Sequence, residues 1–187
     1  MINEDLVKEI ETYLLVKFKN HKKRLKHIYN VKKVAIALGN IYKADIPSVV
    51  VASYLHDATK YDEIDSISNL SSNISKGCIH AYTASELARN RFNIQDNDIL
   101  NAIKYHCSGR INMSLLEKII FVSDFIEEGR EFTSKELRDV AKTNIDKAIY
   151  LIMIQTKNYL LKNNQELSLL TEEAIPYYKK KSEEFND

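Results

Sequence analysis

Apolar residues recur along this chain at the three- and four-residue intervals of amphipathic helices. The first stretch shows the pattern clearly, with Leu6, Ile10, Leu14 and Phe18 on one face. Only four Gly and two Pro interrupt the 187 residues, so long stretches are free of helix breakers. The pattern therefore predicts an all-α fold. The expected helices cover residues 2–18, 25–38, 47–57, 79–92, 96–107, a segment that opens at 115 and carries Asp124, 137–161 and 177–184.

Local signals predict where several of these helices begin and end. Gly39 follows the second helix as a natural C-terminal residue. Ser114 and Glu117 match a capping box, and the run 133–136 is a second candidate cap, for one long helix over 137–161. Pro176 is expected to precede the final short helix. Residues 66–77 are polar and rich in turn formers, which predicts a loop.

Composition limits the classes of function. With 27 basic and 26 acidic side chains the net charge is +1, so a general binder of nucleic acid or of membrane surfaces is not expected. No apolar run approaches a membrane span and no signal peptide is recognisable, which predicts a cytoplasmic protein. Two cysteines are too few for a disulfide framework and are assigned to packing. We expect a single domain over 1–187 with a small-molecule partner.

Histidine and aspartate residues are spread so that five consecutive expected helices each contribute at least one to an inward face or an end. A buried carboxylate is costly unless it is paired or binds a cation, and a divalent metal would explain both aspartates together with neutral inward histidines. Taken one at a time, each histidine is more simply a satisfied core residue. The whole set favours a metal site, and it comprises His27, His56, Asp57, His80, His106 and Asp124.

The order of these residues resembles the HD superfamily of metal-dependent phosphohydrolases. The stretches 101–110 and 113–130 are similar to signatures of its YqeK-like group, the symmetrical bis(5′-nucleosyl)-tetraphosphatases, and the likeness runs from about residue 24 to 160. The resemblance implies an HD-domain helical bundle with flanking helices and two divalent metals. It implies that Asp57 bridges the metals and that iron is the metal, although histidine and carboxylate ligands also suit manganese or zinc. The first metal would be held by His27, His56, Asp57 and Asp124, and the second by Asp57, His80 and His106.

The activity that the resemblance implies is cleavage of diadenosine tetraphosphate at its centre to two ADP by a metal-activated hydroxide. Lys60, three residues after Asp57, is the first candidate for a phosphate contact in catalysis. Arg110 and Arg130 are further candidates because a guanidinium suits phosphate geometry. Further candidates for the pocket wall are Thr59 and Tyr105.

Other interpretations stay open from the sequence. The metal centre could serve a hydrolase of mononucleotides or of guanosine tetraphosphate-type alarmones, or a nucleotide sensor without turnover. A zinc site with thiolates from Cys78 and Cys107 is disfavoured because helical neighbours of His80 and His106 should point elsewhere. The chain also has Glu128 where the group often has Pro before Gly-Arg. The oligomeric state is not fixed, and a homodimer is compatible with the sequence.

Overall fold

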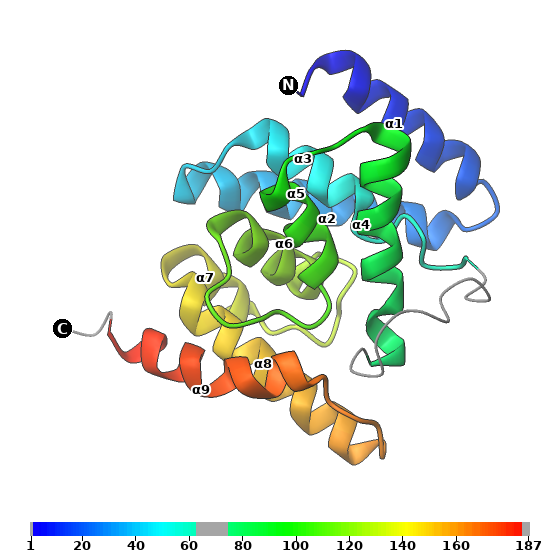
Figure 1. Ribbon diagram of the computed structural model, residues 1–187. Helices are drawn as coiled ribbons and strands as arrows, with labels where there is room; N and C mark the ends of the chain where they lie inside the picture. The colour runs from blue at the N-terminus through cyan, green and yellow to red at the C-terminus, as the bar shows by residue number, and fades with distance from the viewer. Residues whose placement is uncertain (1, 63–74, 185–187) are drawn as a thin grey trace.

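The computed structural model describes residues 2–62 and 75–184 (Figure 1), and within these ranges every regular element is helical. The all-α prediction is therefore confirmed. In chain order the elements are α1 (Glu4–Lys17), α2 (Lys22–Tyr42), α3 (Ile46–Leu55), the 3₁₀ turn η1 (Lys76–Cys78), α4 (Ile79–Phe92), α5 (Asn97–Tyr105), α6 (Leu115–Ile126), α7 (Lys135–Thr143), α8 (Ile145–Lys162) and α9 (Leu169–Glu183).

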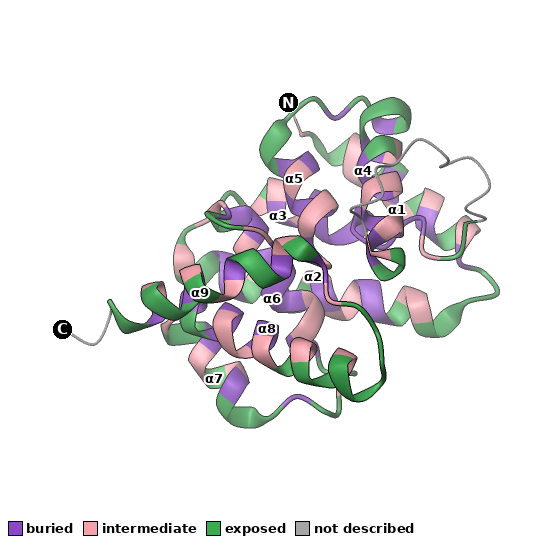
Figure 2. Cartoon of the chain, turned by 60° about the horizontal axis from the view of Figure 1, so that its bottom comes forward, coloured by how far each residue is buried: buried purple, intermediate pink, exposed green. Residues whose placement is uncertain are grey.

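Helices α3 and α6 form the centre of the molecule (Figure 2). Both are apolar on nearly all sides, as a helix enclosed by neighbours must be. In α3 the β-branched run around Val49 and Val51 is buried, so packing outweighs its modest helix propensity. Helix α2 packs against both α3 and α6, while α1 and α9 lie on opposite sides of the bundle. One apolar core runs from α1 to α9.

Side-chain caps fix the starts of α3, α5 and α6, three of the helices that lead to candidate site residues. Asp45 accepts a hydrogen bond from the Ser48 backbone N–H at the start of α3, and Asp96 does the same for α5. The predicted capping box is present, since Ser114 accepts from the Glu117 N–H and Glu117 accepts in return from the Ser114 N–H. These caps determine where the buried helix ends meet.

Gly39 does not end the second helix, contrary to the prediction. Helix α2 continues to Tyr42, and Lys43 takes the left-handed terminal conformation at φ +58°. The glycine instead allows close packing against α3, because a Cβ there would lie 3.0 Å from Ile46 Cδ1 and 3.4 Å from Val49 Cγ2. The residue serves helix contact rather than helix termination.

Two further predicted helices are wrong in extent. The helix expected over 137–161 is divided at Asn144, whose extended backbone and side chain begin α8 by accepting from the Lys147 N–H. The short helix expected after Pro176 is the second half of α9, which contains that proline. Pro176 has no backbone N–H, so α9 lacks one hydrogen bond there. Burial of Ala174 and Tyr178 on the inner face of α9 stabilises the helix despite this loss.

The C-terminal helix also holds the loop between α5 and α6. The Thr171 hydroxyl donates to the Ser108 carbonyl at 2.7 Å, and the Met113 N–H donates to the Tyr178 hydroxyl at 3.0 Å. Most of the loop expected at 66–77 lies outside the described residues, but its last part is the turn η1. Within the described ranges, no helix is long and apolar enough to cross a membrane.

Candidate metal centre

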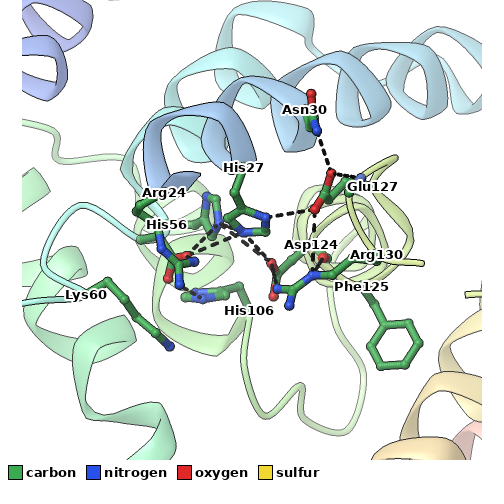
Figure 3. Close-up of polar contacts among 12 residues, drawn as sticks. Arg24, His27, Asn30, His56, Lys60, His106, Asp124, Phe125, Glu127 and Arg130 are labelled. Carbon is green, nitrogen blue, oxygen red and sulfur yellow. Dashed lines mark hydrogen bonds and ion pairs between the residues drawn. The ribbon is translucent and has the colours of Figure 1, made fainter. Parts of the chain in front are cut away.

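The six candidate metal ligands come together, although they are distributed over almost a hundred residues of sequence. His27 lies on α2, His56 and Asp57 follow the last residue of α3, and His80 is the second residue of α4. His106 directly follows α5, and Asp124 lies in the last turn of α6. All are buried except the half-buried Asp124. Figure 3 shows the labelled members of the set pointing toward one another from separate helices.

One half of the cluster gathers around the Oδ2 atom of Asp57. His27 Nε2 lies 3.5 Å from this oxygen and His56 Nε2 lies 3.6 Å from it. The two Nε2 atoms are 3.4 Å apart. Asp124 closes the group, with its Oδ1 at 2.9 Å from His27 Nε2 and 3.9 Å from His56 Nε2.

The other half gathers around the second oxygen of the same carboxylate. Asp57 Oδ1 lies 3.0 Å from His80 Nε2 and 3.7 Å from His106 Nε2. These two Nε2 atoms are 3.3 Å apart. The two oxygens of Asp57 therefore face two different pairs of histidine nitrogens. This is the arrangement of a bridging carboxylate.

Three histidines are oriented by hydrogen bonds at their Nδ1 atoms. His56 Nδ1 lies 2.7 Å from the Ser53 carbonyl and His106 Nδ1 lies 2.7 Å from the Ile103 carbonyl. His27 Nδ1 lies 3.2 Å from Glu127 Oε1. Because carbonyl and carboxylate oxygens only accept, each Nδ1 carries the hydrogen. The Nε2 atoms are thus left to face the centre of the cluster, as in metal-binding histidines.

The electrostatics of the cluster favour a cation. Although burial opposes it, hydrogen bonds to Asp124 and Asp57 raise the pKa of His27 to about 9. Burial lowers the pKa of His56 to about 3 and also lowers that of His80. Against burial, the surrounding histidines hold the pKa of Asp57 well below its usual range. The carboxylates of Asp57 and Asp124 thus favour a proton on His27, where a metal ion would satisfy the same demand.

The spacing of the donor atoms also fits a metal. A tetrahedral site with metal–nitrogen bonds of about 2.0–2.1 Å places its ligand atoms about 3.4 Å apart. Of the eight separations given above, four lie between 3.3 and 3.6 Å, and the other four lie between 2.9 and 3.9 Å. Nitrogen and oxygen donors in this mixture suit divalent transition metals. The residues present therefore fit two metal ions that share Asp57.

Sequence reasoning missed two residues that contact this cluster, Arg24 and Glu127, and one that supports Glu127, Asn30. Arg24 makes a direct ion pair with Asp57 through Nη1. Glu127, almost fully buried, accepts from His27 and also from the Asn30 amide at 2.8 Å. Helical spacing places Arg24 and Asn30 on the face of His27, three residues to either side of it, but it does not show that either of them turns toward the cluster.

The predicted substrate contacts Lys60 and Thr59 both lie beside His80. Lys60 Nζ is 3.2 Å from His80 Nε2, at the edge of the cluster. The Thr59 hydroxyl donates to the His80 carbonyl at 2.7 Å and is buried, so Thr59 positions the start of α4. Lys60 is therefore placed to reach a molecule bound at the cluster. The Thr59 hydroxyl is already used in a hydrogen bond within the protein.

The two predicted arginines differ in their surroundings. Arg130 Nη2 lies 3.2 Å from Asp124 Oδ1, so its guanidinium borders the first half of the cluster. Arg110 makes a two-pronged ion pair with buried Glu117, both bonds at 2.7 Å, and covers the ring of Tyr105. Arg110 and Tyr105 thus lie in a packed unit of their own. Their roles in substrate binding stay predictions.

Cys107 does not point away from the cluster, contrary to the sequence argument. Its Sγ lies 3.3 Å from His80 Nε2 and 3.4 Å from His106 Nε2. The argument from helical neighbours fails here because α5 ends at Tyr105, so His106 and Cys107 belong to a turn. Cys78 is buried beside Ser75, in keeping with a packing role.

A groove of about 400 Å³ opens beside His27. Cationic side chains predominate on its walls, with acidic groups mainly from the α6–α7 connection. A hollow of this size and charge suits an anionic ligand with several phosphates. Its lining residues are Lys23, Arg24, Lys26, His27, Asn30, Tyr61, Glu127, Gly129, Arg130 and Glu131.

Comparisons with known proteins identify the family of the chain. Residues 24–129 match the HD domain. The chain is 36% identical to a protein of Halalkalibacterium halodurans over 77% of this chain and 82% of that protein, and 31% identical to one of Staphylococcus aureus over 92% and 95%. A Bacillus subtilis protein is 32% identical over 74% and 80%. All three are named "Bis(5'-nucleosyl)-tetraphosphatase, symmetrical".

A solved structure is similar over almost the whole chain. It is described as a predicted HD superfamily hydrolase involved in NAD metabolism from Clostridium acetobutylicum, and it is 32% identical with a TM-score of 0.86. The similarity covers 93% of this chain and 97% of that one. The chain therefore belongs to the HD domain family and, within it, to the group of the symmetrical bis(5′-nucleosyl)-tetraphosphatases.

Proposed function

We propose that this chain is a hydrolase that cleaves diadenosine tetraphosphate symmetrically, with two ADP as the products. The observation that carries the proposal is the sharing of Asp57 between two groups of histidines, in a chain of this family. The names of the relatives support the same substrate. They do not favour the alternatives of another nucleotide hydrolase or of a sensor.

The proposal includes two divalent metal ions. His27, His56, Asp57 and Asp124 would hold one of them, while Asp57, His80 and His106 would hold the other. Bound there, such ions lower the pKa of a water to about 7 and neutralise phosphate oxygens. Iron as the metal, a cytoplasmic location and a homodimer stay predictions from the sequence.

The protein's own cations would place the tetraphosphate across the centre. Arg24 and Arg130 border the half of the cluster around His27, and Lys60 borders the half around His80. Positive charge on both sides suits a substrate whose phosphate chain extends in both directions from the bond that breaks. An inner phosphorus would then lie over Asp57, with two phosphates on either side of the cut.

Product analysis tests this function. The protein is purified without oxygen, its metal content is determined, and it is incubated with diadenosine tetraphosphate before the nucleotides are separated. ADP as the sole product supports the proposal. ATP with AMP would overturn symmetrical cleavage, and pyrophosphate release from guanosine tetraphosphate without turnover of diadenosine tetraphosphate would favour the alarmone alternative.

A further inference from the structure

Cys107 occupies the place of a fourth donor in the half of the cluster around His80. Its Sγ, His80 Nε2 and His106 Nε2 form a triangle with sides of 3.3, 3.4 and 3.3 Å. Asp57 Oδ1 lies 3.0 Å from one of these nitrogens and 3.7 Å from the other. The sulfur and the two nitrogens thus form one group, and the Asp57 oxygen lies beside the two nitrogens.

The lengths of this triangle also suit a metal site. A tetrahedral zinc ion with bonds of about 2.3 Å to sulfur and about 2.0–2.1 Å to nitrogen places those atoms about 3.5 Å apart. The thiol also has a side-chain hydrogen bond with Cys78, and the Gly77 carbonyl lies 3.8 Å away, too far for a strong hydrogen bond. The close neighbours of the Cys107 thiol are therefore the two imidazoles and the Cys78 thiol.

The backbone keeps Cys107 in this position. Helix α5 ends at Tyr105, and Gly109 at φ +61° turns the chain two residues after the cysteine. Glycine is favoured at this turn because other residues rarely adopt this φ, and a Cβ there would also lie 2.6 Å from Met153 Cε. Ser108 is held from the other side by the Thr171 hydroxyl. His106 and Cys107 are thus presented together by a fixed turn.

We propose that the Cys107 thiolate is a ligand of the second metal ion, completing a set with Asp57, His80 and His106, and that it makes this position prefer zinc over manganese. The inference rests on the proposed two-metal centre. On metal binding the S–H proton passes to solvent water and a sulfur–metal bond forms. Thiolate is a soft ligand that favours zinc over manganese, whereas the half around His27 offers only nitrogen and oxygen.

Cobalt(II) titration of the whole protein tests the proposal, after its metals are removed with a chelator under reducing, oxygen-free conditions. Thiolate bound to cobalt gives a near-ultraviolet charge-transfer band that nitrogen and oxygen ligands do not give. We expect the band to saturate at one cobalt per chain. Cys107→Ser should lose it, while the matched control Cys78→Ser should keep it. Zinc affinity at one site should fall about a hundredfold in Cys107→Ser, because the binding free energy is shared among the ligands.

The outcomes separate this inference from the proposed function. Uptake of two cobalt ions by the wild type without the band would overturn the role of Cys107 and leave the two-metal centre intact. Absence of cobalt binding would overturn both. A band lost in Cys78→Ser but kept in Cys107→Ser would assign the sulfur to Cys78. The wild-type spectrum decides the main point even if a variant fails to fold.

Discussion

Replacing Glu127 by glutamine tests how the orientation of His27 controls the first metal position. The Glu127 side chain is 4% exposed. Its Oε1 faces His27 Nδ1 at 3.2 Å, while its Oε2 accepts from the Asn30 amide at 2.8 Å and the Gly129 N–H at 2.5 Å. Glutamine keeps the shape but has only one accepting oxygen. The substitution therefore forces a choice between these partners.

The favoured orientation of the new side chain follows from the count of hydrogen bonds. With its oxygen toward Asn30 and Gly129, glutamine keeps two bonds and turns an N–H toward His27 Nδ1. The imidazole would then need its own hydrogen on Nε2, where a metal must bind. Loss of such a supporting partner weakens metal affinity by about 10- to 100-fold, equal to about 1.4–2.7 kcal/mol.

Zinc affinity measured by chelator competition, together with kcat/KM for diadenosine tetraphosphate, gives the readout. We expect Glu127→Gln to weaken one of the two metal positions and to lower kcat/KM by a similar factor. Glu128→Gln is the matched control, because its carboxylate is exposed and pairs with Lys33 on the surface. Wild-type affinity and activity in a folded Glu127→Gln variant would refute the positioning role.

Three further changes have defined outcomes. Asp57→Ala should abolish activity and metal binding at both positions while far-UV circular dichroism stays helical, and near-normal turnover would disprove the bridge. His80→Ala should lose chiefly the second metal, so metal analysis should fall from about two ions per chain toward one. Glu11 accepts from two tyrosine hydroxyls at 2.8 Å, and these bonds lower its pKa from 4.5. Its stabilising effect is therefore complete above pH 4.5 and lost as pH falls through the lowered pKa. Urea unfolding should show a free energy of unfolding lower by about 1–2 kcal/mol for Glu11→Gln than for wild type at pH 7, and a smaller difference at pH 3. An equal difference at both pH values would contradict the expected pH dependence.

Helix periodicity and capping predicted much of the fold. The limits of α4 and the capping box at Ser114 agree with the structure, since both depend on interactions within a few residues. The failures at Gly39, Asn144 and Pro176 have another origin. The outcomes at Gly39 and Pro176 depend on packing against a neighbouring helix. The outcome at Asn144 depends on a capping side chain, which the apolar pattern does not record.

In the candidate site, too, local features could be predicted from the sequence and contacts between elements could not. The six predicted ligands converge because each lies on an inward face or at a buried helix end, both of which the apolar pattern reveals. Cys107 escaped the argument because the angular rule for neighbours applies only inside a helix. Arg24 and Glu127 were missed because a charged residue on a helix face is usually solvated, and only the fold shows them turned toward the cluster.

The attachment of α9 to the loop after His106 extends the metal centre beyond the residues that bind. The matched HD region ends at residue 129, yet Thr171 and Tyr178 hold that loop at Ser108 and Met113. A substitution in α9 can thus displace a ligand without altering any donor atom. Two relatives with identical ligands can therefore differ in metal affinity through their C-terminal helices, and exchange of these helices between them would transfer the difference.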